Sequence, residues 1–226
     1  MMGFSKRKMS NEIYIYGKHK SFQDFLKISD NRLCLEEIES LFENNLFSDI
    51  KDSTTRSASF LIFEKNKSFI TGNISCSRDK SSRKSPFFIG LRTTKYKHNK
   101  SKAFSYFYKV TEYMSKIKSC SFKNFNELKK YSDFIKYYQP DLDVLQTDPK
   151  DFDKNIKEII RLEKKITFKD GKFTNPEELI KRLKYIPDSV SNEIHSVFII
   201  KHKEFVSLTA FFKKINKNEI KNILSN

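Results

Sequence analysis

The feature of the sequence that most limits its fold is a series of short runs of β-branched and aromatic residues separated by polar segments. These runs lie at residues 12–16, 59–63, 68–74, 86–91, 196–200 and 205–212. Runs of this composition and length are typical of β-strands. None approaches the roughly 18–20 uninterrupted apolar residues that a membrane-spanning helix needs. We therefore expect a chain built around a β-sheet, without membrane insertion.

Between these runs, apolar residues recur at three- and four-residue steps, the period of helices that bury one face. We expect such helices at residues 32–45, 103–118, 124–138 and 152–166, and from Pro176 to near Pro187. A further helix is expected to begin at Ser21, because Ser followed three residues later by Asp24 is a variant of the capping box. Its apolar face would carry Phe22, Phe25 and Leu26.

These elements predict an α/β layered sandwich, with a central mixed, largely antiparallel sheet flanked by helices on both faces. The C-terminal pair of strands is expected to join the sheet. A hydrophobic content of 38%, with 14% aromatic residues, is enough to bury a core. The sequence has no internal repeat and no Gly/Ser-rich linker. We expect residues 1–226 to form a single compact domain.

The charge of the chain is strongly basic, with 44 Lys and Arg against 28 Asp and Glu and a formal net charge of +16. Two interpretations stay open. The abundance of Lys, Asn, Ile, Phe and Tyr is what an AT-rich genome produces in any protein. A functional basic face would instead recognise nucleic acid, an anionic membrane or an acidic protein.

The three cysteines, Cys34, Cys76 and Cys120, are far apart and odd in number. That pattern fits buried thiols in a reducing compartment better than a disulfide framework. Residues 1–10 are basic, but no apolar stretch follows that is long enough for a signal peptide. The chain is therefore expected to be cytoplasmic.

Motifs for metal binding, nucleotide binding and nucleophilic catalysis are missing from the sequence. The nearest pair of the four histidines, His195 and His202, flanks a predicted strand, and their odd spacing would point them to opposite faces. With five glycines, the chain has neither a P-loop nor a dinucleotide-binding loop, and it has no nucleophile elbow. We expect a non-enzymatic protein with no metal and no cofactor.

Two polar segments, each following a predicted strand, contain the candidate functional residues. They are Gly17, Lys18, Ser21, Asp24 and Phe25 in the first segment, and Gly72, Ser77, Asp79, Arg83 and Pro86 in the second. Each has a structural interpretation beside the functional one. The two glycines would permit a turn or the close approach of strands. Ser21 and Asp24 would cap a helix. An ion pair between Asp79 and Arg83 would order the polar loop at residues 75–85.

In these two segments the chain resembles the TagF (ImpM) family of accessory proteins of bacterial type VI secretion. That family opens with a strand followed by Gly-Lys-x-Pro-Ser-x-Gly-Asp-Phe, and later carries Gly-x-x-x-x-Ser-x-Asp-Arg-x-Gly-Arg-x-x-Pro-Leu. The ten candidate residues match these motifs without a gap, and Lys80 and Phe87 are conservative changes. Lys20 replaces the Pro, Gln23 and Ser82 replace glycines, and Ser85 replaces an aromatic residue. The Trp usually found before the family's second motif has no counterpart, because the chain has no Trp. It would therefore be a divergent member.

The resemblance covers residues 12–120 and leaves residues 121–226 as a helix-rich extension of unassigned role. It implies a cytoplasmic protein that acts after translation to restrain secretion. It would do so by binding a partner, the secretion system's forkhead-associated protein. The ten candidate residues would then form the partner-binding surface. Two alternatives stay open. One is a nucleic-acid-binding module that uses the Lys, Tyr and Phe residues at 92–102 and 131–138. The other is an enzyme whose site is not visible in linear spacing.

The predicted helix at residues 103–118 has a wide apolar face. Tyr106, Lys109 and Tyr113 lie on its other side, where they would present a docking face.

Overall fold

The computed structural model describes residues 11–30, 55–64, 68–78, 84–96, 99–117, 119–140, 142, 164–171, 176–184, 193–202, 205–216, 218–220 and 222. The strands are β1 (Glu12–Gly17), β2 (Leu26–Ser29), β3 (Thr55–Phe63), β4 (Phe69–Arg78), β5 (Lys84–Thr93), β6 (Lys165–Gly171), β7 (Ser196–His202) and β8 (Phe205–Phe211). The helices are α2 (Lys100–Ile117), α3 (Phe125–Tyr137) and α5 (Pro176–Lys184).

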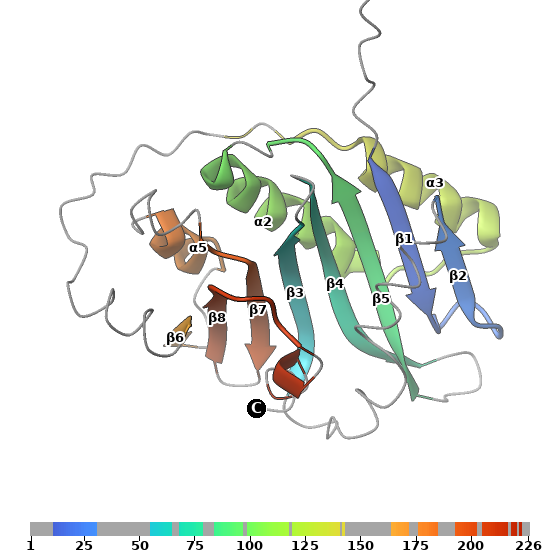
Figure 1. Ribbon diagram of the computed structural model, residues 1–226. Helices are drawn as coiled ribbons and strands as arrows, with labels where there is room; N and C mark the ends of the chain where they lie inside the picture. Colours follow the sequence, from blue (N-terminus) through green and yellow to red (C-terminus); the bar gives the residue numbers. More distant parts are fainter. Residues whose placement is uncertain are drawn as a thin grey trace, which may run out of the picture.

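One large sheet organises the molecule (Figure 1). Its eight strands follow the order β2-β1-β5-β4-β3-β7-β8-β6. Every pairing between the described strands is antiparallel, so the parallel pairing that a mixed sheet requires is not found among them. The predicted addition of the C-terminal strands is confirmed, because β7 pairs with β3.

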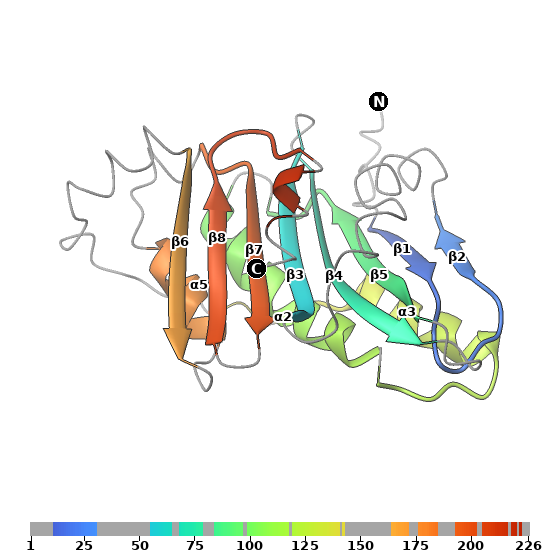
Figure 2. The ribbon, with the colours of Figure 1, turned by 90° about the horizontal axis from the view of Figure 1, so that it is seen from below.

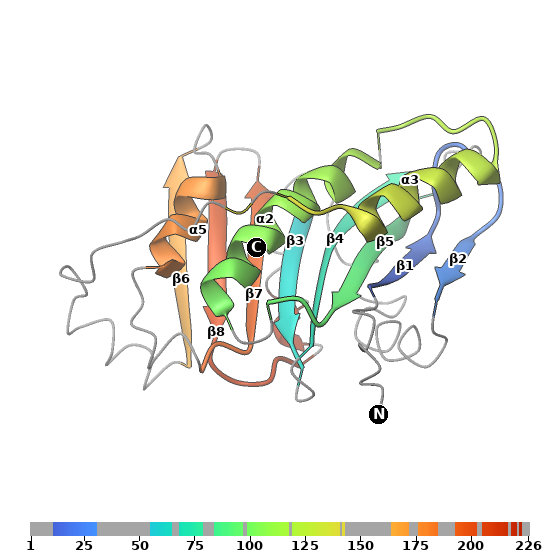
Figure 3. The same ribbon diagram turned by 90° about the horizontal axis from the view of Figure 1, so that it is seen from above.

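Helices α2, α3 and α5 lie on one face of this sheet, which we call the helix face (Figures 2 and 3). Residues 218–220 are helical as well. Ile215 and Ile220, which follow β8, pack instead against the opposite face, here called the far face. Helices on both faces were predicted, and the described residues confirm an α/β composition dominated by the sheet but not that arrangement. The predicted helix at residues 32–45 lies outside the described residues.

The alternation of side chains along the strands separates two buried clusters. In β1, Ile13 and Ile15 belong to the cluster under the helices, and Tyr14 belongs to the cluster on the far face. Helix α2 contributes a row of buried residues to the first cluster, Ala103, Phe104, Phe107, Val110, Met114 and Ile117. Tyr106 is fully buried as well, so the prediction that it belongs to an exposed docking face is wrong.

Several predicted elements are confirmed and two are wrong. Helix α3 is confirmed with Asn124 as its N-cap. The helix predicted from Ser21 is instead a turn followed by strand β2. The polar loop predicted at residues 75–85 is largely a hairpin, since β4 continues to Arg78 and β5 begins at Lys84. The helix predicted at residues 152–166 lies mostly outside the described residues, and its last two residues begin strand β6.

Candidate functional site

The first sequence motif and part of the second lie at one end of the sheet. Gly17, the last residue of β1, pairs with Phe87 of β5, and Phe87 pairs on its other side with Ser75 of β4. We call this region the motif end: residues 17–25 together with residues 75–78 and 84–87. Figure 1 shows β1 ending and β5 beginning there. Segments far apart in the sequence are therefore neighbours in space.

The turn after β1 is hydrogen-bonded to the end of α2 and to the connection between α2 and α3. His19 Nε2 lies 2.9 Å from the carbonyl oxygen of Ile117, the last residue of α2. Lys20 Nζ donates to the carbonyl oxygen of Ser119 at 2.6 Å. The Ser21 hydroxyl oxygen accepts from the backbone N–H of Phe122 at 2.9 Å. Ser21 therefore does not cap a helix of its own, but holds a segment distant in sequence.

His19 is the central residue of this turn and is fully buried. Its ring packs against Phe22, Phe87 and Phe122, with centroid distances of 6.0, 5.4 and 5.3 Å. Because the backbone N–H of Ser21 donates to Nδ1 at 3.2 Å, the ring proton resides on Nε2, which donates to the Ile117 carbonyl. Burial lowers the pKa of His19, the bond to Ile117 opposes that shift, and the charge of Lys20 lowers the pKa further. The imidazole is held neutral.

The other residues of the first motif differ in exposure. Gly17 has φ 118°, a backbone conformation that glycine adopts far more readily than other residues. Lys18 is half-buried, and Asp24 is exposed at the turn. Phe25 is 36% exposed and packs edge-on against Tyr16, with ring centroids 4.5 Å apart. Asp24 and Phe25 are thus the first-motif side chains best placed to contact a partner.

The second motif is only partly brought together with the first. Ser77 and Pro86 lie at the motif end, where they pair across the hairpin with Ser85 and Cys76. Gly72 lies away from that end, in the middle of β4, paired with Phe60 and Gly90.

Asp79 and Arg83, with the ion pair predicted between them, lie outside the described residues.

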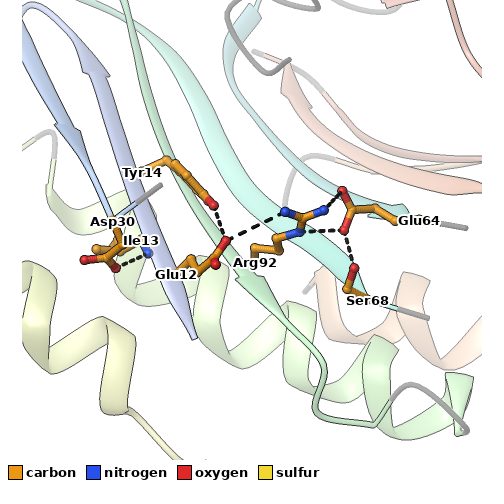
Figure 4. Close-up of polar contacts among 7 residues, drawn as sticks. All are labelled: Glu12, Ile13, Tyr14, Asp30, Glu64, Ser68 and Arg92. Atoms are coloured by element: carbon orange, nitrogen blue, oxygen red, sulfur yellow. Dashed lines mark hydrogen bonds and ion pairs between the residues drawn. The ribbon is translucent and has the colours of Figure 1, made fainter. Parts of the chain in front are cut away.

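A second polar cluster, which the motifs did not indicate, lies at the opposite end of β1 (Figure 4). Arg92 Nε and Nη2 donate to the two carboxylate oxygens of Glu64 at 2.8 and 2.9 Å. Arg92 Nη1 also lies 3.8 Å from Glu12 Oε2. Tyr14 donates to Glu12, and Ser68 donates to Glu64. The cluster joins β1 and β5 to the connection between β3 and β4, with one guanidinium placed between two carboxylates.

Replacing Arg92 with Ala is expected to lower the free energy of unfolding by about 1–3 kcal/mol, because a partly buried Glu64 loses its charged partner. Urea unfolding followed by circular dichroism measures the change. Arg92→Lys is the matched control, since it keeps the charge without the two-pronged contact and should recover only part of the loss. If Arg92→Ala were as stable as the wild type, the cluster would add nothing to the sheet.

The described residues contain no group of three or more His, Cys, Asp and Glu side chains arranged to hold a metal ion.

Among the same residues, no helix has both the length and the apolar character needed to span a membrane.

Comparison of the sequence with models of known protein families finds no match, and comparison with curated proteins finds none either.

Proposed function

We propose that the chain is a non-enzymatic cytoplasmic protein that restrains bacterial type VI secretion by binding a protein partner at the motif end. The resemblance to the TagF family implies this activity. The observation that carries the proposal is the pairing of Gly17 with Phe87 and of Phe87 with Ser75. Because of that pairing, the first motif and the Ser77 and Pro86 part of the second lie at one end of the sheet, which supports a shared binding surface.

The chemistry of the motif end favours recognition over catalysis. The His19 ring and the Ser21 hydroxyl are both engaged with backbone groups of the connection after α2. A general base or nucleophile needs a proton-transfer partner on its substrate, and these two groups are occupied elsewhere. Asp24 and Phe25 offer an exposed carboxylate and an exposed ring. Such a pair suits a protein interface, in which aromatic anchors are flanked by polar groups.

The partner proposed from the resemblance is the forkhead-associated protein of the secretion system. A net charge of +16 would speed the encounter with an acidic partner, since complementary charge raises association rates more than affinity.

The test is a pull-down from the native host with the wild-type chain, an Asp24→Ala/Phe25→Ala variant and an Asp79→Ala/Arg83→Ala variant. We expect type VI secretion components with the wild type and their loss with both double variants, at unchanged melting temperature. Lys169→Ala is the matched control, because Lys169 is an exposed residue of β6 at the other edge of the sheet. It should retain the partner. Absence of secretion components from the wild-type sample would overturn the proposal.

A further inference from the structure

We draw no further inference here: the strongest candidate, the exposed aromatic surface of α3 at Phe134 and Tyr137, carries no proposal because nothing in the described part of the structure shows what covers it.

Discussion

Replacing Gly72 with Ala is expected to lower the free energy of unfolding by about 3 kcal/mol, a typical cost of overpacking a tightly filled core. A Cβ at this position would lie 2.4 Å from the carbonyl oxygen of Ile89 and 2.5 Å from the ring of Phe60. Both distances are shorter than van der Waals contact. The carbonyl belongs to the neighbouring strand β5, so it cannot move away without disturbing the β4–β5 pairing.

The reason for the glycine is the pair of rings packed above it. Gly72 and Gly90 are cross-strand partners in the middle of the sheet. Phe60 and Phe88 stack on each other there, with centroids 5.5 Å apart, and both are buried. The two glycines leave room for those rings to lie against the backbone. The second motif's glycine is thus a packing residue of the far face.

Gly90→Ala is the matched comparison. Its Cβ would meet the Phe88 ring at 2.7 Å, but the backbone oxygen of Thr71 lies at 3.6 Å. A ring can turn aside at lower cost than a backbone carbonyl, so Gly90→Ala should cost less than Gly72→Ala. Guanidinium unfolding of both variants measures the difference. Equal costs, or a Gly72→Ala variant as stable as the wild type, would contradict this account.

The strands were predictable because their signal is local. Residues 12–16, 196–200 and 205–212 are β-branched or aromatic runs, and the strands β1, β7 and β8 form at those places. The ends of β4 and β5 were missed because polar side chains dominate residues 75–85. Their hairpin is held by backbone pairing between the two strands, which side-chain composition does not report.

The turn after β1 shows why a capping pattern can mislead. Ser21 and Asp24 have the spacing of a capping box, yet the Ser21 hydroxyl accepts from Phe122. That partner is far away in sequence, so no local pattern indicates it. The same is true of Arg92, whose contacts with Glu64 and Glu12 depend on the order and register of strands. Tertiary partners overrode local propensity at both places.

Only the resemblance predicted that residues of the two motifs form one surface. Strand order β1-β5-β4 places residues 17–25 at the same end of the sheet as residues 75–78, with β5 between the two strands. The sequence separates these segments widely and contains no direct signal for that order. His19 was not among the ten candidate residues. Its place in the first motif segment, between Lys18 and Ser21, was the available indication of a role in the turn.

Replacing His19 with Leu is expected to destabilise the protein by about 3 kcal/mol at pH 7.5, because the Ser21 N–H and the Ile117 carbonyl both lose their partner inside the core. Leucine keeps most of the apolar contact with the surrounding Phe rings, so the loss reports mainly the two hydrogen bonds. Urea unfolding measures it. His19→Gln is the matched control, since its amide N–H can still donate to Ile117, and it should recover part of the loss.

The wild type is also expected to lose stability as the pH falls below about 6.5, the ordinary pKa of histidine. Burial lowers the pKa of His19 in the folded chain, so the unfolded chain takes up the proton first. The stability that neutral His19 contributes is therefore complete above pH 6.5 and is lost as the pH falls towards the lowered pKa. Carboxylates titrate mainly below this window.

His19→Leu separates this effect from other titrations. The variant cannot take up a proton at position 19, so its stability should fall less steeply than that of the wild type between pH 7 and about 5. The stability of His19→Leu should still fall somewhat with decreasing pH, because burial and the charges of Lys214 and Lys100 also lower the pKa of His195. Identical pH profiles for the wild type and His19→Leu would mean that His19 keeps its ordinary pKa. The turn would then be held without requiring a neutral imidazole.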